Sequence, residues 1–433
     1  MELSRRTASF SKLETIPERN RYRRGTASNG PISVCCASSL CYDYCLLQRD
    51  TIRSPGLDLL RAVAILLVVT WHIPPSYYPF GLKPPGWIGV DLFFVLSGYL
   101  IGSQLLRPYT QNRRLSFAGF YVRRALRILP AYIAVVIVYF TVPAFREQPS
   151  LPPLWKFLTF TQNFGLNSLA TGAFSNAWSL CVEEHFYLML PLIVIWLMKR
   201  PSMLKTALFA SSLFVCGVLL RCLLWMHYVG NVSGLEQKAV LPVYLENIYY
   251  PTYARLDGLL AGVLLAAIGL FRPGWWSRIQ SQPKLLFSSG TIFLSISVWI
   301  CRDMHSFSTA VIGFPLLAIS FGLLLISSLT WDNIPLHRAA SAIATLAYSI
   351  YLTHKPIMHL VHQYGGMFIH NSVLLLLVYP LSILAGATIL HFCVERPFLK
   401  LRGRIVRASL VSSMDRGCDI RPGLSSASAL AGD

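Results

Sequence analysis

The sequence predicts an all-α polytopic membrane protein of about ten transmembrane helices, with both termini on the cytoplasmic side. Of the 433 residues, 54% are hydrophobic and only 13% are charged, whereas a soluble domain carries about a quarter of charged residues. The net charge of +19 does not indicate a nucleic-acid-binding protein, because the basic residues fall in short clusters between apolar segments rather than along one stripe.

Ten apolar segments have about the 20 residues that a helix needs to cross a bilayer. They are residues 56–73, 87–106, 128–145, 178–198, 204–227, 255–271, 285–301, 309–329, 342–364 and 372–394. Cytoplasmic loops hold the excess of Lys and Arg in such proteins. Five basic residues lie in the loops expected outside: Lys83, Arg146, Lys156, Lys238 and Arg302. The basic N-terminal region and the even number of segments therefore put both termini in the cytoplasm.

The transmembrane domain is expected over residues 54–400, between two tails. Residues 1–53 contain the basic run RNRYRRGTASNG and lack the layout of a signal peptide, so we expect a poorly ordered cytoplasmic tail, which could also contact anionic lipid. Residues 401–433 are expected to form a second cytoplasmic tail, and no further globular domain is expected. The ten cysteines show no paired CxxC spacing, which predicts reduced thiols and no metal site.

The first span carries two ionisable residues, Arg61 and His72. Pro55 and Pro74 bracket a helix of about 18 residues, or about 27 Å. Arg61 and His72 are eleven positions apart, so both lie on nearly the same helical face, about 16 Å apart along the axis. Ionisable groups in lipid are costly and usually functional, although Arg61 could instead extend toward the lipid headgroups.

Ionisable residues of four other segments are expected at the depth of His72, toward the outer side. They are Asp91, Glu183, Glu184, Arg255, Asp257, His354 and Lys355. We expect the last four of these to bind substrate. Arg255 and Asp257 are two positions apart, which puts them on different helical faces, so each is expected to pair with another span.

The inner side carries the sequence FYVRRALRILPAY, with Arg123, Arg124 and Arg127 on the first turns of a helix or just before it. Arg124 and Arg127 are three residues apart and hence neighbours on one helical face. Guanidinium groups in this arrangement can hold a phosphate through bidentate hydrogen bonds. The same spacing also fits the ordinary excess of positive charge in cytoplasmic loops.

Seven pieces of the chain resemble, in order, the signatures of the membrane acyltransferase-3 family, whose members modify surface polysaccharides. The pieces are GLDLLRAVAILLVVTWH, GWIGVDLFFVLSGYLI, RRALRILPAY, AWSLCVEEHFYL, RLDGLLAG, YSIYLTHKPI and VERPF. Each piece alone is weak, and the ordered set, which spans about residues 54 to 400, is specific.

This resemblance implies roles for individual residues. The family signature of Arg or Lys, ten residues and then His falls on Arg61 and His72, which implies that His72 acts in acyl transfer. The paired-arginine signature falls on Arg124 and Arg127, and it implies that they bind an acyl-coenzyme A donor.

The acidic signature of the family falls on Glu183 and Glu184. The chain departs from the family at two neighbouring positions, with Cys181 where the family usually has Ser and His185 where it has Gln. These departures leave the fold unaffected and bear on acceptor specificity.

Topology and resemblance together predict an O-acyltransferase, with acetyl transfer favoured, in the bacterial inner membrane. Acetyl-coenzyme A or another acyl-coenzyme A would dock its phosphates on Arg124 and Arg127, with Arg123 as a third candidate, and its arm would extend toward His72. Neutral His72 would remove the proton from a hydroxyl of a lipid-linked or surface carbohydrate. Glu183, Glu184 or Asp91 would orient the imidazole, as a carboxylate does in hydrolases.

Two other functions remain open from the sequence. A secondary transporter also places ionisable residues at mid-membrane, but it predicts an internal repeat, and the paired arginines have no counterpart in the second half. A polyprenol-linked sugar transferase would need an acidic, metal-binding outer loop. The outer loops here carry scattered acids only.

Overall fold

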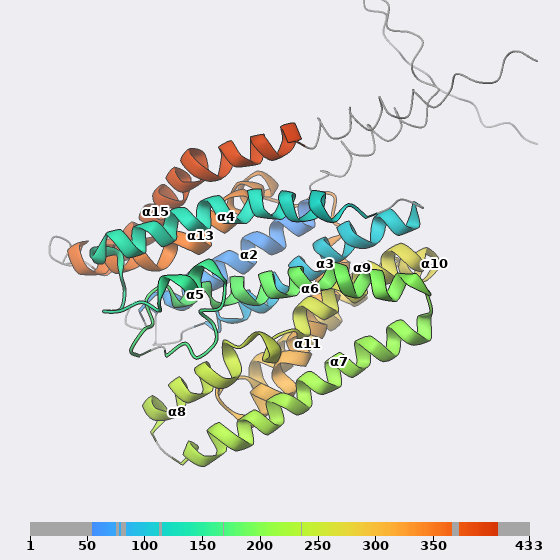
Figure 1. Cartoon of the computed structure of the whole chain (residues 1–433), viewed down its shortest axis with the longest axis horizontal. Coiled ribbons are helices and arrows are strands. Elements are labelled where there is room, and N and C mark those ends of the chain that lie inside the picture. Colours follow the sequence, from blue (N-terminus) through green and yellow to red (C-terminus); the bar gives the residue numbers. More distant parts are fainter. Residues whose placement is uncertain are drawn as a thin grey trace, which may run out of the picture. The chain divides into compact units, whose positions relative to one another are not determined.

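The computed structural model describes residues 54–74, 78, 84–111, 115–167, 169–234, 236–365 and 372–405. All of these belong to one compact unit of the chain that begins at Arg53, and the described part is built from helices without β-strands (Figure 1). This confirms the all-α class. The two tails predicted for residues 1–53 and 401–433 lie outside the described residues, except for residues 401–405, which continue a helix.

The N-terminal half of the bundle contains four long helices. They are α2 (Pro55–His72), α3 (Ile88–Thr110), α4 (Phe117–Thr141) and α6 (Trp178–Lys199). Between α4 and α6 the chain forms a loop that includes η3 (Pro143–Phe145), α5 (Leu154–Leu158) and η4 (Ser175–Ala177).

The C-terminal half alternates long helices with short or bent segments. Its elements are α7 (Met203–Leu224), η5 (Trp225–Val229), η6 (Gly230–Val232), α8 (Gln237–Tyr244), η7 (Leu245–Tyr249), η8 (Thr252–Ala254), α9 (Asp257–Phe271), α10 (Pro273–Gln280), α11 (Pro283–Ile300), η9 (Thr309–Gly313), α12 (Phe314–Ser328), α13 (His337–Leu360), η10 (Val361–Gly365), α15 (Ser372–Leu390) and η11 (His391–Glu395).

Local sequence signals account for several helix ends. Helix α2 begins with Pro55, which suits a first helical position because its missing N–H would be unpaired there anyway. Ser116 caps α4, since its hydroxyl accepts a hydrogen bond from the Gly119 N–H at 3.2 Å. Between α9 and α10 the chain bends by 111° at Pro273, which cannot continue the hydrogen-bond ladder of α9.

Helices form at all ten of the predicted segments, but in the described part eight are long and apolar enough to cross a bilayer. The bent pair α9–α10 would be a ninth. Helix α9 has only 15 residues, and α13 is too rich in hydroxyl and charged side chains to count by composition. The ten predicted transmembrane helices therefore exceed the number that helix length and composition support. The chain still has several helices that can cross a membrane.

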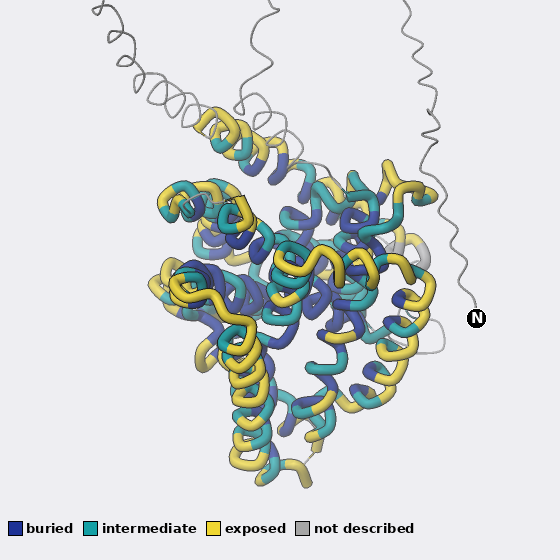
Figure 2. Tube along the Cα trace, turned by 90° about the vertical axis from the view of Figure 1, so that its right-hand side faces the viewer, coloured by how far each residue is buried: buried dark blue, intermediate teal, exposed yellow. Residues whose placement is uncertain are grey.

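The periphery of the bundle is apolar. Large apolar side chains of α7, α11 and α15 are exposed, among them Leu208, Leu219, Ile292 and Leu381, and Figure 2 shows peripheral helices that are exposed along most of their length. Contiguous exposed apolar surface on this scale is unusual for a soluble protein. It is the surface that a lipid bilayer would cover.

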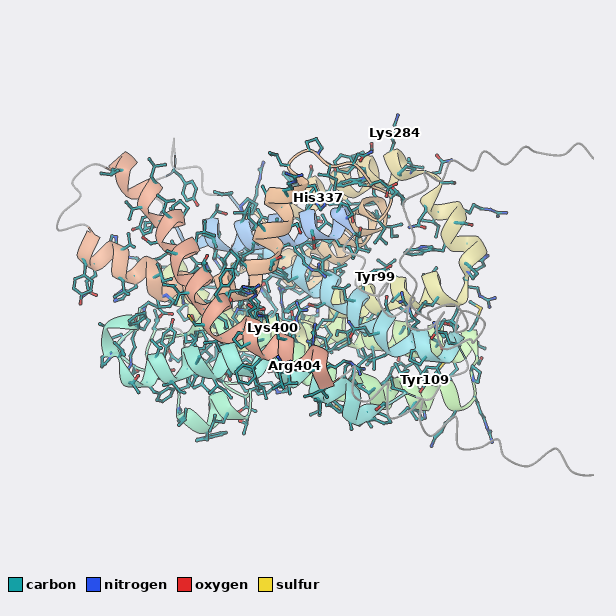
Figure 3. All side chains as sticks on the ribbon, turned by 90° about the horizontal axis from the view of Figure 1, so that it is seen from above. Tyr99, Tyr109, Lys284, His337, Lys400 and Arg404 are labelled. Atoms are coloured by element: carbon teal, nitrogen blue, oxygen red, sulfur yellow. The ribbon has the colours of Figure 1, made fainter. Side chains whose placement is uncertain are left out.

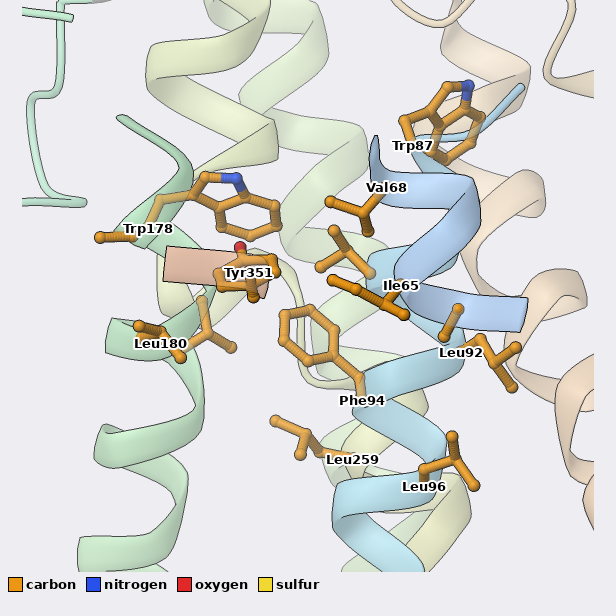
Figure 4. Close-up of a cluster of buried hydrophobic side chains, with 14 of the residues drawn as sticks. Ile65, Val68, Trp87, Leu92, Phe94, Leu96, Trp178, Leu180, Leu259 and Tyr351 are labelled. Carbon is orange, nitrogen blue, oxygen red and sulfur yellow. The ribbon is translucent and has the colours of Figure 1, made fainter. Parts of the chain in front are cut away.

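Helix α3 lies at the centre of the packing and contacts α2, α6, α9 and α12. Its closest partner is α9, because Gly98 of α3 and Gly262 of α9 let the two backbones approach. Figure 4 shows the adjoining core, where Phe94 of α3 lies among side chains of neighbouring helices, including Trp178 and Leu259. The position of α3 therefore fixes α2 and α6, which carry candidate site residues.

We expect Gly98→Ala to destabilise the bundle, because a Cβ at this position would overlap the carbonyl oxygen of Leu259. Overpacking of this kind costs about 1–3 kcal/mol, so the thermal unfolding midpoint of the detergent-solubilised chain should fall. The matched control is Gly403→Ala, whose Cβ would meet open space. Equal midpoints for the two variants would contradict the proposed close packing of α3 on α9.

Candidate functional site

Two histidines from distant parts of the sequence lie side by side. His72 ends α2 and His354 lies on α13, and their ring centroids are 4.9 Å apart in an edge-to-face arrangement. The His72 Nδ1 lies 2.9 Å from the Val68 carbonyl oxygen. His72 is half-buried, whereas His354 is fully buried. The sequence placed both residues at one depth, and the packing of α2 on α13 brings them into contact.

Lys355, next to His354 on α13, is tied to the loop that follows α4. Its Nζ lies 2.9 Å from Glu147 Oε1 and donates to the Ser175 hydroxyl at 2.8 Å. Glu147 also accepts hydrogen bonds from the Tyr139 hydroxyl and the Phe174 N–H, each at 2.9 Å. This carboxylate therefore connects α4, its following loop and α13 beside the histidine pair.

Glu183 and Glu184, at the second turn of α6, make different contacts. Glu183 accepts hydrogen bonds from the Ser97 hydroxyl at 3.2 Å and the Tyr187 hydroxyl at 2.7 Å. Glu184 lies 3.8 Å from Arg124 Nη2, and the Arg124 guanidinium stacks 3.8 Å from the centre of the Tyr187 ring. The acidic signature of α6 thus contacts the paired-arginine signature of α4.

The arginines of α4 form one cluster with a fourth arginine. Arg123 and Arg127 are exposed, and Arg124 has a buried Nε without a hydrogen-bond partner among the described residues. Arg402, from the end of the last described helix, lies close enough to repel all three. Figure 3 shows Lys400 and Arg404, which flank Arg402 in the sequence, on this helical end. So many converging positive charges favour an anionic ligand.

Asp91 and Arg255 form an ion pair inside the bundle, with 2.9 Å between Asp91 Oδ1 and Arg255 Nη2. Both side chains are buried. The Arg255 guanidinium lies over the rings of Phe314, Tyr249 and Trp178, at 3.7, 4.7 and 5.7 Å from their centres. Burial raises the pKa of Tyr249 well above its ordinary value, so this ring stays neutral beside the cation.

Asp257 pairs with Arg221 of α7 instead of with Arg255. The Arg221 guanidinium donates to both carboxylate oxygens, at 2.7 and 3.0 Å, and also to the carbonyls of Ala254 and Ala310. Arg221 is 1% exposed, so the bidentate pair is fully desolvated. The expectation that Arg255 and Asp257 pair with other spans is confirmed.

Arg61 lies near the opposite end of α2 from His72. Its Nη1 is 3.0 Å from the Asp58 carboxylate, whose other oxygen accepts a hydrogen bond from the Ser341 hydroxyl at 3.0 Å. Arg61 therefore takes part in a network that joins α2 to the start of α13.

Sequence reasoning missed four side chains of these networks: Asp58, Glu147, Arg221 and Arg402. Asp58 could have been found, because it lies three residues before Arg61 and hence on the same helical face. Arg221 was visible as a lone cation in an apolar segment, which normally needs a buried partner. Nothing local distinguishes Glu147 or Arg402 from loop and tail charges, because their contacts come from other elements.

Comparison with known proteins supports the resemblance noted in the sequence. Residues 54–392 match a family model described as an acyltransferase domain. The chain is 29% identical over 332 residues to the peptidoglycan O-acetyltransferase OatA of Listeria monocytogenes, over 71% of this chain and 49% of the relative. It is 26% identical over 337 residues to the O-acetyltransferase OatA of Staphylococcus aureus strain NCTC 8325, over 72% and 51%.

The chain spans about half the length of these curated relatives. No solved structure matches it.

The Arg221–Asp257 pair should be strongly coupled. Removing one partner of a buried ion pair costs about 3–5 kcal/mol, because the other charge is left uncompensated. We therefore expect Arg221→Met and Asp257→Leu each to lower the unfolding free energy by this amount, and the double variant to lose much less than the two losses combined. The exposed Arg278 supplies the control variant Arg278→Met. Additive losses in chemical denaturation would show that the pair is not coupled.

Proposed function

The chain belongs to the acyltransferase-3 family of membrane acyltransferases, and from this membership we propose that it is an integral membrane O-acetyltransferase. It transfers an acetyl group from cytoplasmic acetyl-coenzyme A to a hydroxyl of a cell-wall or lipid-linked carbohydrate on the other side of the bacterial plasma membrane. The relatives carry the names O-acetyltransferase and peptidoglycan O-acetyltransferase, which supports acetyl as the group and a glycan as the acceptor.

The position of His72 is the observation that carries this proposal. A carbonyl oxygen only accepts hydrogen bonds, so the Nδ1 that faces Val68 bears the proton of the neutral ring. The lone pair of the neutral imidazole is then on Nε2. A neutral imidazole with a fixed tautomer, at the end of a membrane helix, is the group that a hydroxyl needs as a general base near neutral pH.

In the reaction, His72 Nε2 takes the proton of the acceptor hydroxyl while the hydroxyl oxygen bonds to the acyl carbon. The bond from the acyl carbon to sulfur then breaks, and the departing thiolate takes the proton from the imidazolium. The products are the O-acyl carbohydrate and the free thiol, and His72 is neutral again.

The arginine cluster of α4 fits the donor. Arg123 and Arg127 are exposed, Arg124 keeps an unpaired Nε among the described residues, and Arg402 adds a fourth charge. Guanidinium groups bind phosphates through bidentate hydrogen bonds, and coenzyme A carries phosphates at the end remote from its thioester. The cluster lies near the start of α4, and His72 ends α2, so the donor would extend through the bundle.

The remaining predicted residues support the site in different ways. Glu183 accepts a hydrogen bond from the Tyr187 hydroxyl, and Glu184 pairs with the Arg124 guanidinium. Both carboxylates are proposed to position the arginines that bind the phosphates of the acyl donor. Asp91 and Arg255, buried as a pair, are proposed to hold α3 beside the acceptor path. Lys355, near the outer loop, is proposed to contact the acceptor together with its partner Glu147.

Loss of the base should abolish most of the activity. In reconstituted vesicles supplied with radiolabelled acetyl-coenzyme A and lipid-linked glycans, we expect His72→Ala to lower the rate of label transfer by about 10²- to 10⁴-fold, the usual contribution of a general base. The control is His227→Ala, since His227 is exposed on another element. Transfer at the native rate by His72→Ala would remove His72 from the mechanism.

Loss of a cluster arginine should weaken donor binding specifically. A hydrogen bond to a charged group contributes about 1.5–3 kcal/mol, so Arg127→Ala should raise the dissociation constant for coenzyme A by about ten- to hundredfold. The control Lys284→Ala removes an exposed positive charge at the start of α11. Equal affinities in titration calorimetry for Arg127→Ala and Lys284→Ala would reject the phosphate contact and leave the role of His72 untouched.

A further inference from the structure

We propose that His354 is a positioning residue for His72. The Nε2 of His354 accepts a hydrogen bond from the imidazolium that His72 becomes during the reaction. The inference rests on the proposed function, because that function makes His72 the base. It replaces the earlier expectation that His354 binds substrate with a role exerted through its neighbour.

The hydrogen bonds of His354 fix its tautomer. Its Nδ1 lies 3.1 Å from the Ile350 carbonyl oxygen and 2.9 Å from the Tyr351 carbonyl oxygen. Because carbonyls only accept, the Nδ1 of the neutral ring must carry the proton and the lone pair must be on Nε2. That Nε2 is buried and has no hydrogen-bond partner among the described residues. A buried acceptor left unpaired costs about 1–3 kcal/mol, so it calls for an explanation.

The neighbour of this lone pair supplies the explanation. The His72 ring is the one that lies 4.9 Å away, centre to centre, and its Nδ1 also faces a carbonyl. In the resting state both rings therefore have a lone pair on Nε2, and neither nitrogen can donate to the other. Once His72 takes a proton, its Nε2 becomes a donor and the two nitrogens are complementary.

This complementarity exists only after proton transfer. As the acceptor oxygen bonds to the acyl carbon it loses its basicity and no longer competes for the new N–H of His72, which can then donate to a nitrogen acceptor. His354 Nε2 is that acceptor, and it keeps the proton on His72 Nε2 until the departing thiolate takes it. An interaction made in the charged state and not in the resting state accelerates the chemical step rather than binding.

The charges around His354 favour the acceptor role. The groups that face it are Lys355 on its own helix, Glu147 from the loop after α4, and His72 from α2. The Lys355 ammonium disfavours a second positive charge on His354, so the proton stays on His72. The Glu147 carboxylate, 2.9 Å from Lys355 Nζ, in turn balances the ammonium and holds this part of α13 in place.

Two isosteric substitutions separate this role from a structural one. The amide nitrogen of Asn overlays His Nδ1, so His354→Asn keeps the donor to the backbone carbonyls and deletes Nε2. The amide of Gln reaches the position of Nε2, so His354→Gln keeps an acceptor there and gives up the backbone contact. The matched control is His359→Asn, on the same helix and away from the pair.

With the full chain in vesicles, we expect His354→Asn to lower kcat for acetyl transfer by about ten- to hundredfold, the effect of one hydrogen bond to a charged group. The KM for acetyl-coenzyme A should stay within about twofold of native, because a group acting in the chemical step alters kcat. His354→Gln should retain the larger share of kcat although its unfolding midpoint is lower. The reverse order, with kcat following the unfolding midpoint, would overturn the proposal.

A second measurement needs no transfer activity. In the full chain with ¹⁵N-labelled histidines, the Nε2 resonance of His354 should move as acid protonates His72, and this movement should vanish in His72→Phe. If acid moves the Nε2 resonance of His354 equally in the native chain and in His72→Phe, the proposal is also overturned. Absence of label transfer by the native chain would contradict the proposed acetyltransferase function alone, since the resonance decides the contact between the two rings independently.

Discussion

The requirement that buried charge be compensated within the protein governs how these helices are arranged. Lipid offers no hydrogen-bond partner, so each ionisable side chain inside the bundle must find its counterpart within the protein, and three cations find it on another element. Arg221 holds Asp257, Arg255 holds Asp91, and Lys355 holds Glu147. Each of these pairs connects residues far apart in the sequence, and together they determine which helices can be neighbours.

Close backbone packing makes those pairs possible. Because Gly98 and Gly262 allow α3 and α9 to approach, Asp91 at the start of α3 comes within reach of Arg255, just before α9. The same arrangement places α3 against α6, so that Ser97 donates to Glu183. The ion pair and the hydrogen bond of α3 therefore depend on the close packing of helices that the glycines allow.

The polar groups divide into two kinds by their contacts. Asp257 and Arg221 satisfy one another and stabilise the interior. The histidine pair, the arginine cluster and the Asp91–Arg255 pair instead retain atoms that the described residues do not pair, among them His354 Nε2, Arg124 Nε and Asp91 Oδ2. Unpaired buried polar atoms are rare in folded proteins, and the first two lie where the proposed acyl transfer needs a proton acceptor and a phosphate ligand.

The sequence by itself determined the helical membrane class, the helical segments, the family, and the residues around which the proposed site is built. Hydropathy and helical periodicity are local properties, and the family signatures lie in continuous stretches such as the one that ends in His72. Only the tertiary structure decided the partners: that His72 meets His354, that Glu184 meets Arg124, and that Glu147 and Arg402 join them. Such contacts depend on how close two helices approach and how each is rotated about its axis, and no single stretch of sequence encodes either quantity.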